Sequence, residues 1–319
     1  MAKAAAKKKP AGTQTRASAS PPAGKAKAAE PALYSDGSPQ DEVQYLECKL
    51  ILKPDRFTSA KVFFEYGKLV ARTAEKFGIG FSDKGIVLNP VLREVVFLDT
   101  ADFRLYNSAF ILRRRIRYEN GFPAGEPEVV FKFRHPDLAT AATMDVRPNI
   151  AGQYRIKFKA EALPLKNEVG GLRLLYSHNV QFGLSQAPEG DRTSMAMLAD
   201  VFPALAPLKA AGAERVELVN QTIVEEVLQD LGVLNFGKGV KAKANIAIWR
   251  ERGTHHALCG EFAFQAKFER ANQLHDKARE RCKAFFIELQ QAGRDWLSLG
   301  TTKTGLVYRL KGNPPQAHE

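Results

Sequence analysis

The chain of 319 residues is 45% hydrophobic and 26% charged, which suits one large domain or two modest ones and excludes a chain disordered throughout. Its 47 basic and 35 acidic residues give a net charge of +12, which indicates an anionic partner. Three cysteines without CxxC spacing favour a reducing compartment, and no run of about 20 apolar residues predicts a membrane span. We therefore expect a cytoplasmic protein that does not enter a membrane.

The first 40 residues differ in composition from the rest of the chain. They are rich in Ala, Lys, Pro, Ser and Gly, and no large apolar residue occurs between Met1 and Leu33. Such a segment cannot bury enough surface to offset the entropy lost on ordering, so residues 1–40 are predicted to be a disordered basic tail. We expect at most weak contact of this tail with nucleic acid or another polyanion. Residues 41–312 are predicted to form one domain, followed by a flexible C-terminus at 313–319.

Eight short runs of the domain alternate apolar and polar residues with the period of a half-buried strand. In the first run, Leu46, Cys48 and Leu50 share one face, whereas Glu47 and Lys49 share the other. The sequence therefore predicts eight strands. They cover residues 45–52, 94–100, 109–118, 127–135, 152–161, 214–221, 240–251 and 257–269.

Helical spacing of apolar residues marks two longer segments between these strands. The first covers residues 60–77 and ends at Gly78, and the second covers residues 270–292. Shorter helical runs are predicted near 164–178 and 192–201. Strands and helices together predict an α+β fold.

Basic residues dominate the polar faces of several predicted strands. These positions include Arg113 and Arg115 on one strand, Lys132 and Arg134 on the next, and Lys157 on a third. A sheet with its charged face in water explains any one strand, but like charges stacked on one face repel each other. A closed barrel with the charged faces turned inward around an anion explains the strands together, with the apolar faces outward beneath the helices.

The residue types on these faces suit a polyphosphate chain. Arginine makes bidentate contacts with phosphate, and lysine supplies compact positive charge. The few acids on the same faces, Glu47 and Glu261 foremost, are predicted to hold Mg²⁺ or Mn²⁺, since carboxylates, waters and phosphate oxygens are the ligands of such hard cations. In hydrolysis a metal ion neutralises charge on the phosphates and helps to orient water.

Two elements near the middle of the chain have a characteristic order. Residues 97–105 read Phe-Leu-Asp-Thr-Ala-Asp-Phe-Arg-Leu, and residues 112–115 read Leu-Arg-Arg-Arg. This order resembles the aromatic-x-Asp-Thr-x-Asp-x-x-Leu and Leu-Arg-x-Arg elements of the CYTH superfamily, the triphosphate tunnel metalloenzymes. The resemblance covers most of residues 43–310 and implies an eight-stranded antiparallel β-tunnel with helices packed outside.

The resemblance also bears on the site residues. Lys132 stands where the family has a phosphate-binding lysine, and Lys303 follows Thr302 as in the Ser-Lys element of some members. The family's opening Glu-x-Glu-x-Lys element keeps its second glutamate and its lysine but has Tyr45 in place of the first glutamate. Together with the charge alternation, the resemblance predicts phosphate-binding residues Lys49, Arg113, Arg115, Lys132, Lys157 and Lys303, and metal ligands Glu47 and Glu261.

Several functions are compatible with such a tunnel. The first hypothesis is a metal-dependent phosphohydrolase that acts on inorganic triphosphate or a nucleoside triphosphate. The second is a non-catalytic module that binds triphosphate or polyphosphate, which the loss of a carboxylate at Tyr45 favours. A polyphosphate polymerase is a third possibility, and nucleic-acid binding through the tail is a fourth. The fold does not choose between these, because related tunnels carry out different reactions.

Overall fold

The computed structural model describes residues 42–190, 192–208, 214–268 and 273–311. The predicted tail at 1–40 and the predicted C-terminus at 313–319 lie outside these residues. Within them, strands β1 to β10 cover Tyr45–Leu52, Gly80–Ser82, Val91–Asp99, Phe110–Glu119, Phe122–His135, Arg155–Leu163, Arg173–Gly183, Glu217–Gly237, Val240–Glu251 and Ala257–Lys267. Helices α1 to α6 cover Lys61–Lys76, Arg104–Asn107, Leu138–Thr143, Met195–Val201, Asp276–Ala292 and Lys303–Tyr308. None of these helices combines the length and hydropathy that crossing a membrane requires.

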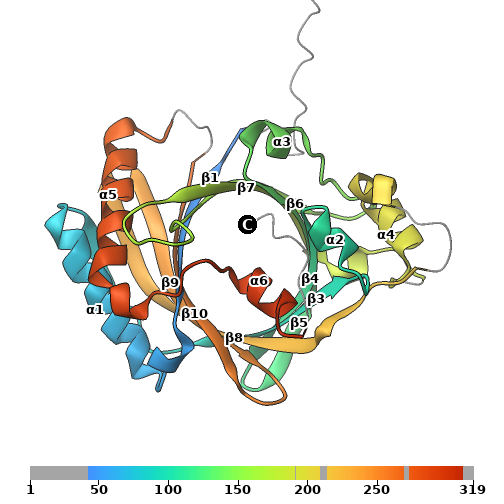
Figure 1. The fold of residues 1–319 in the computed structure, drawn as a ribbon, viewed down its shortest axis with the longest axis horizontal. Helices are drawn as coiled ribbons and strands as arrows, with labels where there is room; N and C mark the ends of the chain where they lie inside the picture. Colours follow the sequence, from blue (N-terminus) through green and yellow to red (C-terminus); the bar gives the residue numbers. More distant parts are fainter. Residues whose placement is uncertain (1–41, 191, 209–213, 269–272, 312–319) are drawn as a thin grey trace, which may run out of the picture. The chain divides into compact units, whose positions relative to one another are not determined.

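Nine strands close into a barrel in the order β8-β3-β4-β5-β7-β6-β1-β10-β9, and β9 pairs with β8 to complete the ring (Figure 1). The short strand β2 pairs with β8 outside the ring. A ring with an odd number of strands cannot reverse direction at every step, so at least one pair must be parallel. That pair is β1 and β6. The predicted barrel is confirmed, but the prediction of eight strands, all antiparallel, is wrong by one strand and one pair.

The ninth strand is β7, in the segment for which the sequence predicts a helix at 164–178. The adjacent Leu174 and Leu175 interrupt the period-2 alternation that would indicate a strand. In the structure β7 pairs with β5 on one edge and with β6 on the other. Pairing along both edges therefore overrides the local preference of this segment.

Strand β8 is much longer than the predicted run at 214–221. Its first part pairs with β3, and a register shift separates Leu218 from Ile223 along that pairing. Asn220 and Gln221 occupy this bulge with φ angles of 52° and 51°. The bulge interrupts the period-2 pattern, which is why the alternation ends there although the strand continues to Gly237.

Helices cover the outer face of the barrel in two places. On one side, α1 and α5 lie beside β9 and β10, and Tyr66 and Phe285 pack with Phe262 and Phe264 of β10 (Figure 1). On the other side, α4 covers β4, β5 and β7, where Phe131 belongs to a second buried cluster. The prediction that the apolar faces point outward beneath the helices is therefore confirmed.

A third buried cluster occupies part of the barrel interior. It joins inward-facing residues of the strands, among them Ile51, Phe97 and Ile111, to Val307 and Tyr308 of α6. In the ribbon view α6 lies within the ring of strands (Figure 1). The interior thus has an apolar end that contains α6 and, next to it, a polar cavity.

Candidate functional site: a cationic cavity in the barrel

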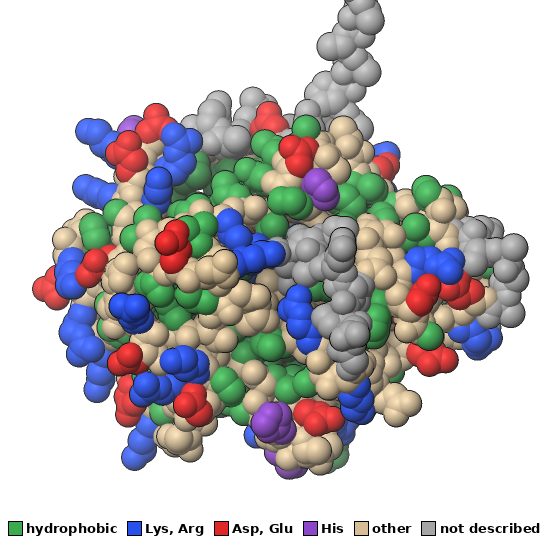
Figure 2. Space-filling view, in the orientation of Figure 1, with side chains coloured by type: hydrophobic (Ala, Val, Ile, Leu, Met, Phe, Trp, Pro, Cys, Tyr) green, Lys and Arg blue, Asp and Glu red, His purple; other side chains and the backbone are tan. Residues whose placement is uncertain are grey.

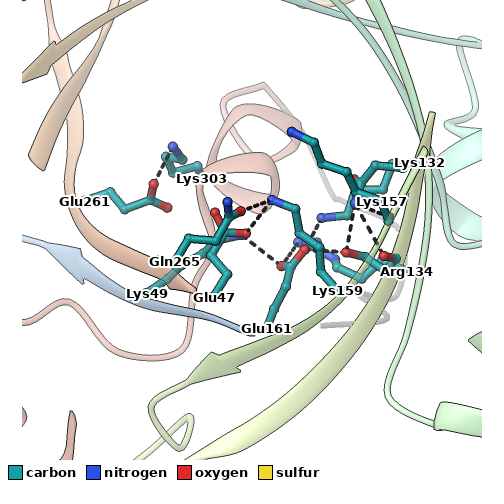
Figure 3. A network of polar contacts seen from close by, with 12 residues as sticks. Glu47, Lys49, Lys132, Arg134, Lys157, Lys159, Glu161, Glu261, Gln265 and Lys303 are labelled. Carbon is teal, nitrogen blue, oxygen red and sulfur yellow. Dashed lines mark hydrogen bonds and ion pairs between the residues drawn. The ribbon is translucent and has the colours of Figure 1, made fainter. Parts of the chain in front are cut away.

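The cavity has a volume of about 240 Å³ and a largely charged wall. Basic side chains outnumber carboxylates in that wall by eight to four. They are Lys49, Arg93, Arg113, Arg115, Lys132, Arg134, Lys159 and Lys303, facing Glu47, Glu161, Glu226 and Glu261. Because inward positions alternate along each strand, several strands contribute their polar faces to this one cavity. The close-up shows the members of this set from β1, β5, β6, β10 and α6 pointing toward one another (Figure 3).

The structure brings together every sequence-predicted site residue except Lys157. The predicted residues that line the cavity are Glu47, Lys49, Arg113, Arg115, Lys132, Glu261 and Lys303. Lys157 lies instead beside Tyr45, with its Nζ atom 5.7 Å from the ring centroid.

Glu161, on β6, is the most deeply buried acid of the cavity, with 1% of its surface exposed. It accepts hydrogen bonds from Lys49 Nζ at 3.0 Å, from Ser177 Oγ at 2.6 Å and from Lys132. Burial alone would raise the pKa of this carboxyl, but Lys132, Lys49 and Arg134 hold it well below its usual range. Glu161 is therefore a fixed negative charge that orders the basic side chains around it.

Glu47, on β1, is held by lysines on both sides. Its Oε2 atom lies 3.0 Å from Lys49 Nζ and 3.1 Å from Lys159 Nζ, which also donates to Gln265 at 2.7 Å. Burial opposes ionisation, yet Lys159 and Lys49 keep the pKa of Glu47 well below its usual range. Conversely, burial would lower the pKa of Lys49, but Glu161 and Glu47 raise it. Glu47 and Lys49 are therefore both charged at neutral pH.

Lys303, at the start of α6, connects the helix to strands β8 and β10. Its Nζ atom lies 2.6 Å from Glu261, 3.2 Å from Glu226 and 4.5 Å from the ring centroid of Trp249. Glu226 also accepts a hydrogen bond from Trp249 Nε1 at 2.8 Å. Although burial would raise the pKa of Glu226, Lys303 and the nearby Arg93 lower it to about 2. Lys303 thus forms ion pairs with carboxylates of two strands.

The two arginines of β4 that line the cavity differ in how their charge is compensated. Arg115 Nε donates to Glu128 at 3.0 Å. No carboxylate of the described residues lies within ion-pair distance of Arg113, and its buried Nε has no hydrogen-bond partner among them. Burial and the neighbouring Arg115 lower the pKa of Arg113 to about 10, so it still carries its charge at neutral pH. Arg113 is therefore a cation of the cavity wall without an ion-pair partner in the described part of the chain.

The predicted metal ligands Glu47 and Glu261 do not converge. In the register of β1 and β10, Glu47 faces Gln265, whereas Glu261 faces Ile51. The two glutamates are therefore offset by four residues along the strand pair. That offset corresponds to about 13 Å along the strands. Each carboxylate is also held by lysine, as described above. Among the described residues no group of three or more His, Cys, Asp or Glu side chains is placed to hold a metal ion. These residues do not fit a shared Mg²⁺ or Mn²⁺ site.

Several cavity residues were missed by sequence reasoning. Arg93 precedes the predicted start of its strand at 94, and Glu226 follows the predicted end of its strand at 221. Arg134, Lys159 and Glu161 were assigned to charged strand faces but not to the site. Each of them lies on the same strand face as Lys132 or Lys157, and this could have indicated that they point inward. The alternation alone does not predict how deep in the barrel a residue lies.

Asp99, within the segment 97–105, has a structural role. Its Oδ atoms accept hydrogen bonds from the backbone N–H groups of Thr100, Leu105 and Tyr106, at 2.8 to 2.9 Å. Tyr308 of α6 donates its hydroxyl to Asp99 Oδ2 at 3.0 Å. Burial raises the pKa of Asp99 to about 6, against the effect of these donors. Asp99 therefore joins the turn after β3 to the helix that carries Lys303.

Comparisons with known proteins return similar architectures but no close relative. No family model matches the chain, and no curated protein does. An adenylyl cyclase candidate from Hippeastrum, in which a dominant triphosphatase activity was found, aligns with a TM-score of 0.41 and 12% identity over 86% of this chain and 100% of its own. An adenylate cyclase candidate from Bacillus halodurans aligns with a TM-score of 0.37 and 13% identity, over 82% of this chain and 95% of its own. A Pyrococcus horikoshii protein aligns with a TM-score of 0.34 and 11% identity, over 84% of this chain and 99% of its own.

These values describe only a loose likeness. We therefore assign the fold class from the strand order of the structure and not from these alignments. The chain forms a closed β-barrel with helices outside and a charged interior, which is the tunnel architecture that the CYTH resemblance implies.

Proposed function

We propose that the protein binds the phosphate chain of inorganic triphosphate, of a nucleoside triphosphate or of polyphosphate inside the barrel. The observation that supports this most is the charge of the cavity, in which eight basic side chains face four carboxylates. Buried positive charge without a counter-ion is costly, so an anion of high charge density is the ligand that such a cavity favours. A chain of phosphates supplies several negative charges in a narrow shape.

The internal ion pairs indicate how the ligand would be held. Arg113 has no carboxylate partner among the described residues, so it is available to phosphate oxygens without breaking a contact. Lys49, Lys132 and Lys303 are oriented by carboxylates that already hold them in the cavity. Side chains ordered before binding lose less entropy when the ligand arrives. We therefore assign phosphate binding to Arg113, Arg115 and these three lysines.

Hydrolysis of triphosphate or a nucleoside triphosphate with Mg²⁺ or Mn²⁺ is the second candidate function. It is favoured by the ionised state of Glu47 and Glu226, which offer hard oxygen atoms near the expected phosphates. Because Glu47 and Glu261 do not converge, binding is the function that the geometry supports better. A polymerase activity, a cytoplasmic location and contact of the tail with nucleic acid stay predictions.

A panel of phosphates tests the proposal. Orthophosphate, diphosphate, tripolyphosphate and ATP are titrated calorimetrically into the full chain, and affinity is expected to rise from orthophosphate to tripolyphosphate. Orthophosphate release is measured in parallel with Mg²⁺, Mn²⁺ and chelator. Release above that of an Arg115→Ala variant would support the hydrolase. Equal, weak binding of every member of the panel would contradict the proposed function.

A further inference from the structure

A cluster of lysines surrounds Tyr45 on the inward face of β1. The ring is 8% exposed, and the Nζ atoms of Lys157, Lys159 and Lys267 lie 5.7, 5.9 and 6.0 Å from its centroid. At such distances the negative face of an aromatic ring attracts a cation. We call these four residues the Tyr45 cluster.

Strand register explains why the lysines meet at this ring. Tyr45 faces Lys159 across the parallel pair of β1 and β6, and faces Lys267 across the antiparallel pair of β1 and β10. Lys157 lies two residues before Lys159 on the same face of β6. The close-up shows Lys157 and Lys159 beside the ion pairs of the cavity (Figure 3). The Tyr45 cluster is thus continuous with the cationic cavity.

The Tyr45 cluster keeps an excess of positive charge. Lys159 pairs with Glu47, which it shares with Lys49. Among the described residues, no carboxylate lies within ion-pair distance of Lys157 or Lys267. Burial, together with neighbouring Lys159 and Arg155, lowers the pKa of Lys157 to about 8, as expected where positive charge is uncompensated. The aromatic ring gathers the ammonium groups without cancelling their charge, whereas a carboxylate at this position would cancel one of them.

The outer surface differs in this respect. In the space-filling view, basic and acidic side chains are interspersed over α1 and α5 (Figure 2). Pairs such as Lys76 with Glu288 and Arg279 with Asp276 illustrate the mixing. The excess of positive charge near Tyr45 thus contrasts with the mixed charge over α1 and α5.

We propose that the Tyr45 cluster is an anion subsite that holds one end of the phosphate chain directly, so that recognition of the chain requires no divalent cation. This rests on the function proposed above and adds the mode of recognition. A divalent cation would meet net positive charge here, and Glu47 already has two lysine partners. The lysines supply what a bridging metal ion would otherwise supply, namely positive charge against the phosphate oxygens.

The test is calorimetric titration of inorganic tripolyphosphate into the full chain, once in EDTA and once in excess Mg²⁺. Binding in EDTA is expected to be at least as tight, since Mg²⁺ neutralises part of the ligand's charge. The double variant Lys157→Ala/Lys267→Ala is expected to bind about tenfold more weakly in EDTA. The matched control is Lys61→Ala/Lys68→Ala on the exposed surface of α1, which removes the same charge from the outside of the barrel. Its affinity is expected to stay within about twofold of wild type.

Substitution of Tyr45 tests the metal dependence. Tyr45→Glu places a carboxylate among the lysines and a second carboxylate on the same face as Glu47. It is expected to lower affinity about tenfold in EDTA and to recover part of it with Mn²⁺. Tyr45→Phe keeps the ring and is expected to change affinity less. Because Tyr45 is buried, thermal denaturation of each variant is recorded alongside.

Each outcome decides something. Loss of wild-type binding in EDTA, or full affinity of the Lys157→Ala/Lys267→Ala variant, overturns the inference. If wild type binds, Arg113→Ala does not, and the Tyr45 cluster variants bind normally, the proposed function stands and the subsite is wrong. Absence of wild-type binding in both buffers overturns the proposed function and the subsite with it.

Discussion

The same strands build two different regions inside the barrel. On β1, the inward residues change from Glu47 and Lys49 to Ile51, and on β4 they change from Arg113 to Ile111. The charged residues line the cavity, and the apolar ones pack with α6. We call these regions the polar end and the apolar end.

The comparison shows that facing inward does not by itself define a functional residue. The apolar end packs strands and α6 into a buried cluster, which is the usual source of folding stability. The polar end holds opposed charges whose net contribution to stability is small or unfavourable, because desolvation offsets their attraction. Its composition is better explained by a ligand than by folding. Substitutions in the two ends should therefore affect different measurements.

The largest expected effect is on folding, from Phe97→Ala in the apolar end. Phe97 is 1% exposed and its ring lies 6.1 Å from those of Trp249 and Tyr308. Removing it is expected to lower the free energy of unfolding by about 3–5 kcal/mol, measured by urea denaturation. The folded fraction should still bind tripolyphosphate, so a large loss of affinity in the folded protein would remove the distinction between the two ends.

The next effect is on binding, from Lys303→Ala in the polar end. The change removes one cation and leaves Glu226 and Glu261 without their shared partner. Affinity for tripolyphosphate is expected to fall about 100-fold, or about 2.7 kcal/mol, by calorimetry. Lys303→Arg keeps the charge and serves as the control. Equal losses for both variants would mean that packing of α6, and not charge, is responsible.

A smaller effect on stability is expected at the junction between Asp99 and α6. Tyr308→Phe removes the hydrogen bond to Asp99 and should destabilise the fold by about 1–3 kcal/mol, seen as a lower melting temperature. Tyr106→Phe is the matched control, since the rings of Tyr106 and Tyr308 stack at 4.1 Å and the Tyr106 hydroxyl has no hydrogen-bond partner among the described residues. A greater loss for Tyr106→Phe would contradict the role of the hydrogen bond.

The smallest effect concerns pH. In the free protein the pKa of Lys157 is lowered to about 8, so its positive charge is lost as the pH rises through that value. A bound anion stabilises the protonated form and raises this pKa, so binding takes up protons near pH 8 and weakens as the pH rises. We expect a roughly threefold greater loss of affinity between pH 7 and pH 9 for wild type than for Lys157→Ala. The ligand's own titration is common to both proteins, and parallel pH profiles would exclude the contribution of Lys157.

Period-2 alternation predicted the inward faces of β1, β4 and β5 correctly, because side-chain direction in a strand follows from backbone geometry alone. Lys49, Arg113, Arg115 and Lys132 could therefore be identified from the sequence. The number of strands could not be predicted, because the segment of β7 lacks clear alternation and becomes a strand by pairing with β5 and β6. Glu226 was missed because the bulge at Asn220 and Gln221 hides the continuation of β8.

The depth of each residue in the barrel also lay beyond the sequence. Lys157 and Lys159 share a face of β6, yet the cavity wall includes Lys159 and Lys157 lies beside Tyr45. Depth depends on the register between strands, which follows from the closed barrel as a whole. The separation of Glu47 from Glu261 also results from the register between strands. The alternation of residues along each strand does not predict it.

The central claim is that the polar end binds a phosphate chain, and two adjacent arginines of β4 test it most directly. Arg113 lines the cavity, whereas Arg114 is exposed on the outer face of the same strand. In calorimetric titrations with tripolyphosphate, wild type and Arg114→Ala are expected to bind with similar affinity. The affinity of Arg113→Ala for tripolyphosphate should be at least about tenfold lower than that of wild type. Absence of binding by wild type, or equal losses for the two variants, would contradict the claim.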